Sequence, residues 1–134
     1  MIEEKLSVKK NLQEQVFTSS YNLGIAITGS PEFKNYTEAR NNFVKDEEAK
    51  KLLLTYNQLV RKLNDPVYNQ TNPEQLNIQV DTQKKLMYKN KILKNYFDSE
   101  AALVNLFKEL NLYISRKLNF DFASFSKSQN SCCS

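Results

Sequence analysis

The sequence predicts an all-α protein of about five helices, forming a helical bundle with long antiparallel helices and assembled as a dimer. Apolar residues recur at steps of three and four along most of the 134 residues, as expected for helices with one buried face. Two glycines and three prolines are few breaks for a chain otherwise rich in helix-forming residues. We predict no strand in any segment.

The first helix is predicted over residues 3–27, and polar residues around Gly24 weaken its pattern. We expect this helix to fray before Gly29. The second helix is predicted from Pro31 to about Phe43, because Ser30 is a typical N-cap and proline is favoured at the first helical position. The partial apolar stripe of the first helix consists of Leu6, Leu12, Val16, Leu23 and Ile27.

The third helix, over residues 47–64, has the clearest pattern. Asp46 is its natural N-cap, and Asp65 with Pro66 ends it. We predict a polar loop over residues 65–71. A fourth helix then starts after Asn72, with Gln75 placed to complete a capping box, and it ends near a break or polar interruption at Asn90.

The last helix is predicted over residues 91–118. Its apolar stripe spans roughly 40 Å at 1.5 Å per residue, which exceeds the radius of a compact domain of this size. We therefore expect a partner along the whole stripe, supplied by the first helix or by a second subunit. The residues that we assign to this assembly interface are Leu93, Tyr96, Phe97, Leu103, Val104, Phe107, Leu110 and Ile114.

The chain is predicted to divide into a helical domain, residues 1–122, and a flexible polar tail, residues 123–134. Phe120, Phe122 and Phe125 precede or begin this tail without helical spacing. They either pack back onto the bundle or dock into a partner, and packing is favoured because exposed clusters of phenylalanine are unfavourable.

Composition excludes several functional classes. The chain has no histidine, which removes histidine bases, Ser-His-Asp and Cys-His nucleophiles and histidine metal ligands. Gly24 and Gly29 cannot form a phosphate-binding glycine loop. We therefore predict no enzyme. The net charge of +4 is scattered, so direct nucleic-acid binding is not expected. No apolar run suits a membrane span or a signal peptide, and we expect a cytoplasmic protein.

The order of several short motifs resembles the YlbF/YmcA family of small bacterial helical proteins. Ser30-Pro31-Glu32-Phe33 begins one helix and Asp46-Glu47-Glu48-Ala49 begins the next. Ile114-Ser115 lies near the end of the long helix, and Asn119-Phe120-Asp121-Phe122 follows it. The resemblance extends from about Leu12 to the end of the chain, including the terminal cysteines.

This resemblance implies a non-enzymatic regulator of competence, sporulation or biofilm formation in Gram-positive bacteria. Two members of the family join an unrelated third protein in a complex. That complex acts with a membrane-anchored endoribonuclease in messenger RNA processing, and its cysteines hold iron–sulfur clusters. Other members are helical dimers without an assigned role. A homodimer and a hetero-complex with related helical proteins are therefore both expected partners.

Cys132 and Cys133 are the candidate metal ligands. Thiolates suit iron–sulfur clusters, but such a cluster usually has four protein ligands. Two chains, identical or different, would supply them, and the resemblance favours different chains. The alternatives are two incidental thiols, a purely structural helical dimer without a cofactor, and a nucleic-acid-binding helical module.

Overall fold

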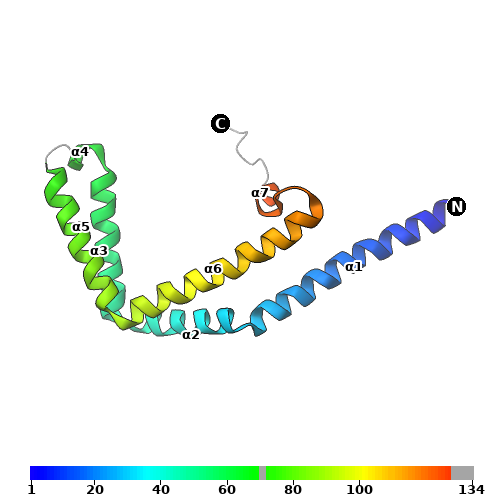
Figure 1. The fold of residues 1–134 in the computed structure, drawn as a ribbon, viewed down its shortest axis with the longest axis horizontal. Helices are drawn as coiled ribbons and strands as arrows, with labels where there is room; N and C mark the ends of the chain where they lie inside the picture. The colour runs from blue at the N-terminus through cyan, green and yellow to red at the C-terminus, as the bar shows by residue number, and fades with distance from the viewer. Residues whose placement is uncertain (70–71, 128–134) are drawn as a thin grey trace.

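The computed structural model describes residues 1–69 and 72–127. Within these ranges the chain forms seven helices and no strand, which confirms the predicted all-α class (Figure 1). Five of the seven are long and match the five predicted helices. No helix of the described part combines the length and the apolar character needed to cross a bilayer.

Helices α1 (Ile2–Gly29) and α2 (Pro31–Lys45) follow one another almost without a break. Ser30 separates them. Its hydroxyl oxygen accepts a hydrogen bond from the backbone N–H of Phe33, as predicted for an N-cap, and donates one to the carbonyl of Ile27. Helix α1 continues to Gly29, so the predicted fraying was wrong: this bond to the last turn of α1 ties the two helices together.

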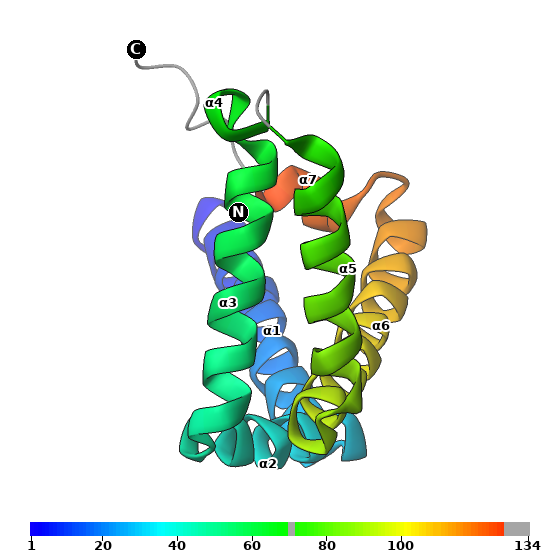
Figure 2. The ribbon, with the colours of Figure 1, turned by 90° about the vertical axis from the view of Figure 1, so that its left-hand side faces the viewer.

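Helices α3 (Glu47–Asn64) and α5 (Pro73–Lys89) form an antiparallel hairpin (Figure 2). The side-chain amide of Gln83 on α5 donates a hydrogen bond to the backbone carbonyl of Leu52 on α3, with an N–O distance of 2.9 Å. This bond fixes one helix against the other in the middle of the hairpin.

The connection between these two helices differs from the predicted loop. It contains a short helix, α4 (Pro66–Asn69), whose first turn is stabilised by a hydrogen bond from the N–H of Val67 to the Asp65 carboxylate. The predicted capping box is also absent. The side-chain amide of Asn72 donates to the side chain of Gln75, and it caps no backbone N–H of α5.

Helix α6 (Lys91–Leu118) starts at Asn90, whose side chain accepts the N–H of Leu93. Asn90 is therefore a true break between α5 and α6. The first half of α6 runs antiparallel to α2 (Figure 1). Where the hairpin meets α6, Ala49, Met87 and Leu93 form a small buried core. A last short helix, α7 (Phe122–Ser126), folds back onto the end of α6.

Candidate assembly surface

An aromatic stack marks the face of α6 that meets α2. The ring of Tyr96 stacks on the rings of Phe43 and Tyr36, with centroids 4.8 Å and 5.9 Å apart. Burial raises the pKa of Tyr96, and the neighbouring Tyr36 raises it further. The hydroxyl of Tyr96 is thus neutral at physiological pH, as suits an aromatic ring within an intramolecular contact.

The eight α6 residues assigned to an interface fall into two groups. Leu93 and Leu103 are buried within the chain, and Tyr96 and Phe97 are half-buried. Their apolar surface is mostly covered by this chain alone. The others lie further along the helix. Val104 and Phe107 are 43% and 44% exposed, and Leu110 and Ile114 are partly exposed. An assembly role for this second group stays a prediction.

Helix lengths explain this division. Helix α2 has 15 residues and α6 has 28, or roughly 22 Å against 42 Å. Pro31, the first residue of α2, and Ala102 of α6 line the same surface hollow. Helix α2 therefore covers α6 only up to about Ala102. Helix periodicity places later residues of α6 on the face that carries Tyr96, at steps of 11, 14, 18 and 22 residues. These residues, which α2 does not cover, are Phe107, Leu110, Ile114 and Leu118.

Helix α1 has no buried residue at all. Its apolar stripe faces few neighbours: Val16 is 63% exposed and Leu12 is 57% exposed. Apolar side chains outside the stripe, such as Tyr21 and Ile25, are exposed as well. A 28-residue helix of this composition is not expected to remain uncovered in water, because helices stay folded mainly through packing of an apolar face.

Helices α1 and α6 both extend away from α2 toward the same side of the molecule (Figure 1). They diverge in the perpendicular view, enclosing an open angle that we call the V (Figure 2), and they make few contacts with one another. Of the two predicted ways to cover the stripe of the last helix, cover by the first helix is therefore wrong, since the two helices separate where α2 ends. Cover by a second subunit stays a prediction. We define the assembly surface as the exposed apolar residues of the two arms. These are Leu6, Leu12, Val16 and Leu23 of α1, with Phe107, Leu110, Ile114 and Leu118 of α6.

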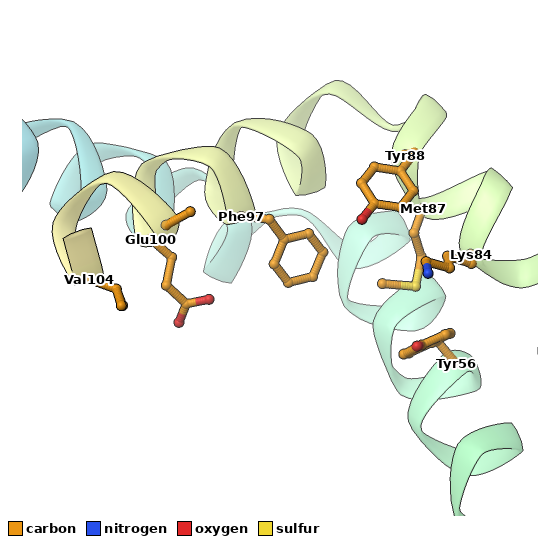
Figure 3. A pocket seen from close by; sticks show the side chains of 8 residues that line it. Tyr56, Lys84, Met87, Tyr88, Phe97, Glu100 and Val104 are labelled. Carbon is orange, nitrogen blue, oxygen red and sulfur yellow. The ribbon is translucent and has the colours of Figure 1, made fainter. Parts of the chain in front are cut away.

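A second apolar feature lies between the hairpin and α6. It is a cavity of about 400 Å³ lined by Tyr56 of α3, Met87 and Tyr88 of α5, and Phe97 and Val104 of α6 (Figure 3). Lys84 and Glu100 also line it and add one charge of each sign. Its size and lining suit an apolar side chain or small apolar group. Two residues of the predicted interface, Phe97 and Val104, thus contribute to this cavity.

The end of α6 holds α7 through a set of polar contacts. Asn119, in the left-handed conformation with φ 59°, reverses the chain. The hydroxyl oxygen of Ser115 then accepts the N–H of Phe122, and the side-chain oxygen of Asn111 accepts the N–H of Ala123, each at 2.9 Å. The carboxylate of Asp121 accepts the N–H of Ser124. The orphan donors of the first turn of α7 are satisfied in this way.

These contacts also affect Asp121 and the phenylalanines. Hydrogen bonds from the N–H of Ser124 and from the side chain of Asn111 lower the pKa of Asp121. The rings of Phe120 and Phe125 pack together with centroids 5.0 Å apart, yet they remain 47% and 76% exposed. We predicted that the phenylalanines pack back onto the bundle. These two rings instead pack on each other, and about half or more of each stays exposed. We did not predict this set of contacts, although Asp121 three residues before Ser124 is a recognisable helix cap.

The candidate metal ligands are at the end of the chain. Cys132 and Cys133 lie outside the described residues, as does most of the predicted tail. The predicted boundary between residues 122 and 123 falls inside α7. In residues 1–69 and 72–127, no group of three or more histidine, cysteine or acidic side chains is arranged to hold a metal ion.

Comparison with known proteins gives two matches. Residues 16–119 match the family described as control of competence regulator ComK, YlbF/YmcA. The fold resembles the X-ray crystal structure of Bacillus subtilis RicA, which was solved in complex with RicF. The TM-score is 0.63 at 15% sequence identity, covering 78% of this chain and 94% of RicA, so this likeness concerns the fold. No curated protein sequence matches the chain.

Proposed function

The chain belongs to the YlbF/YmcA family, and on this basis we propose that it is a non-enzymatic adaptor that acts by binding other proteins in a regulatory complex. The observation that carries the proposal is the assembly surface. Two helical arms keep large apolar side chains in water, among them Val16 at 63% and Phe107 at 44% exposure. Large exposed apolar surfaces mark protein interaction sites, whereas single scattered apolar residues do not.

The proposed partner is a related helical protein, in a hetero-complex. The support is that RicA, which shares this fold, was crystallised with RicF. We further propose that the complex acts with an endoribonuclease in messenger RNA processing in the cytoplasm, and thereby in competence, sporulation or biofilm control. The support for this finer role is the resemblance to the family, and no residue of the described chain carries it.

We propose that Cys132 and Cys133 contribute two thiolates to an iron–sulfur cluster shared with partner chains. The support is the thiolate chemistry of such clusters and the need for four ligands, which one chain does not provide. Iron and acid-labile sulfide, measured on protein purified without oxygen from its own host, test this role. We expect both in the wild type and neither in Cys132→Ser/Cys133→Ser. Their absence from fresh wild-type protein would reject it.

Nucleic-acid binding is the less favoured candidate because the basic residues are scattered along the sequence among acidic ones. Lys50 is paired with Glu47 and Lys94 with Asp98, so part of the positive charge is already compensated along the helices. A nucleic-acid-binding module would instead show strongly salt-dependent binding.

The test of the adaptor function is affinity purification of the tagged protein from its host, comparing two neighbouring substitutions. Ile114→Glu places a charge on the assembly surface, whereas Tyr113→Glu changes a residue that is 73% exposed and lies about 100° around the helix. We expect Ile114→Glu to lose the partner proteins that wild type captures and Tyr113→Glu to retain them. Circular dichroism checks that both variants fold. Capture of the same partners by both variants would reject this surface as the binding site.

A further inference from the structure

The cavity between the hairpin and α6 has aromatic and thioether side chains on its walls. Tyr56, Tyr88 and Phe97 supply rings from three different helices, and the thioether of Met87 lies between Tyr88 and Tyr56 in the view of Figure 3. Such rings attract a further ring edge-to-face or offset, and a thioether sulfur also makes favourable contacts with rings. The lining therefore favours an aromatic side chain as the group that fills the cavity.

Two charged side chains of opposite sign border this cavity. Lys84 belongs to α5 and Glu100 to α6, on opposite sides of the Phe97 ring in the view of Figure 3. Within residues 1–69 and 72–127, neither Lys84 nor Glu100 forms an ion pair or a hydrogen bond. Both charges are thus available to a ligand that carries a carboxylate on one side of an aromatic group and a cation on the other.

We propose that this cavity binds a helix of a partner protein through one aromatic side chain, with an acidic residue one turn to one side for Lys84 and a basic residue one turn to the other side for Glu100. The inference rests on the proposed function, because it takes the chain to act by binding proteins. It adds a second binding site, which shares no residue with the assembly surface, and it adds the chemistry that this site recognises.

The exposed rim of the cavity favours a helix over a small molecule. Tyr88 and Val104 are 58% and 43% exposed, so a ligand confined to the cavity would leave this rim largely in water. Small-molecule sites instead bury most of the surface of their ligand. A helix that lies across the cavity covers the rim with its backbone and its neighbouring side chains, as amphipathic helices do in other apolar grooves.

The surroundings of the cavity also favour a helix over an extended segment. An extended peptide gains affinity mainly by adding a strand to an exposed sheet edge. The described part of the chain contains no strand and offers no such edge. Side chains of a helix recur on one face every three or four residues. This spacing suits the order of Lys84, the rings and Glu100 across the cavity.

Methyl NMR on methionine tests the proposal directly. The chain has only two methionines, which are Met87 in the cavity wall and Met1, which is 96% exposed. The probe is an alanine-rich helical peptide of about 17 residues. It carries one phenylalanine, with a glutamate one turn before it and a lysine one turn after it. We expect this peptide to shift the Met87 methyl signal of the full chain in a saturable way and to leave the Met1 signal unchanged.

One change in the peptide and two in the protein separate the parts of the site. Replacement of the peptide phenylalanine by alanine should weaken binding about tenfold or more, because the anchor in the cavity is lost. Lys84→Gln should weaken binding roughly threefold, as expected for an exposed ion pair, and should not affect a peptide with glutamine in place of its glutamate. Glu100→Gln should behave in the same way toward the lysine of the peptide.

Neighbouring alanines on α6 offer a matched pair of blocking variants. Ala101 lines the cavity, whereas Ala102 lines the separate hollow between α2 and α6, and both are exposed. Ala101→Leu should fill the cavity and abolish the shift of Met87 on addition of the peptide, and Ala102→Leu should leave this shift as in the wild type. Because both positions are exposed, both variants are expected to fold, and circular dichroism checks this.

Several results would overturn the proposal. A Met87 signal of the wild type that stays unchanged at millimolar peptide would show that the site is absent. Equal binding of the phenylalanine and alanine peptides, or of N-acetylphenylalanine amide and the whole peptide, would show that no helix with an aromatic anchor is recognised. Unchanged affinity in both Lys84→Gln and Glu100→Gln would refute the charge recognition. A Met87 signal that shifts on dilution of the protein alone would show that a second copy occupies the cavity.

The outcomes for the two proposals are separable. If Ile114→Glu loses the captured partners while no peptide shifts the Met87 signal, the adaptor function stands and the cavity site is rejected. If the peptide binds as expected while Ile114→Glu and Tyr113→Glu capture the same partners, the cavity site stands and the assembly surface is rejected.

Discussion

The carboxylate of Asp46 accepts the backbone N–H of Ala49 at 2.7 Å, and Ala49 is itself completely buried. Asp46 thus caps α3, and Ala49, which donates the capping hydrogen bond, is part of the buried core at the end of the hairpin. Ala49, Met87 and Leu93 together form this small buried cluster. The start of α3 is therefore fixed both by local hydrogen bonding and by packing.

Removal of this cap should lower stability. Asp46→Ala is expected to reduce the free energy of unfolding by about 1 kcal/mol, because the N–H of Ala49 loses its acceptor. Asp46→Asn keeps an oxygen acceptor at the same place and should cost less than half as much. Urea unfolding followed by circular dichroism measures both. Equal losses in the two variants would contradict the capping role.

The small core predicts a larger effect at Leu93, which is 0% exposed. Leu93→Ala is expected to reduce the free energy of unfolding by about 2–5 kcal/mol, through lost burial and the cavity left behind. Leu54→Ala is the matched control, since Leu54 is 59% exposed on α3, and it should cost less than about 0.5 kcal/mol. Similar midpoints of thermal unfolding for the two variants would show that Leu93 is not in the core.

The aromatic stack between α2 and α6 predicts a specific loss at Phe43. Phe43→Ala removes a ring that lies 4.8 Å from Tyr96 with planes 10° apart. A half-buried ring in such a contact should contribute about 2 kcal/mol to stability. The neighbouring Val44, 52% exposed, provides the control Val44→Ala, which should be nearly neutral. Denaturant unfolding that ranks Val44→Ala as the more destabilising change would refute the role of the stack.

The attachment of α7 should depend on pH. The N–H of Ser124 and the side chain of Asn111 hold the pKa of Asp121 below its ordinary value of 3.8. A lowered pKa means that the ionised carboxylate stabilises the folded state above that ordinary value, and that this contribution is lost as the pH falls through the lowered pKa.

A carboxyl-detected NMR titration of Asp121 should therefore show a midpoint below 3.8, with the amide signal of Ser124 shifting in parallel. In Asp121→Asn, which keeps an acceptor for that N–H but cannot ionise, the Ser124 signal should lack this transition. A midpoint at or above the ordinary value would contradict the hydrogen bonds at this site.

Local signals predicted most of the helices. Ser30 and Asp46 each accept a backbone N–H at the start of a helix, as predicted. Asn90 also caps a helix, although the sequence was read there only as a break or a polar interruption. The ends of the helices Glu47–Asn64 and Lys91–Leu118 coincide with the predicted ones. The segment after Asp65 was misjudged because a polar stretch of seven residues suits a loop and a single helical turn equally well.

The candidate site was predicted only in part. Phe107, Leu110 and Ile114 were identified from periodicity, and they are exposed or partly exposed on the uncovered half of α6. Leu93 and Leu103 had the same periodicity but are buried inside the chain. Periodicity places a residue on a face of a helix and carries no information on what covers that face.

The sequence by itself determined the all-α class, the positions of the five long helices and the apolar stripe of α6, because these depend on contacts between residues three or four apart. Only the tertiary structure decided that α2 covers the first half of that stripe and that α1 diverges from α6 beyond the start of α2. Those outcomes depend on the relative lengths and directions of segments that lie far apart in the chain, about which helical periodicity carries no information.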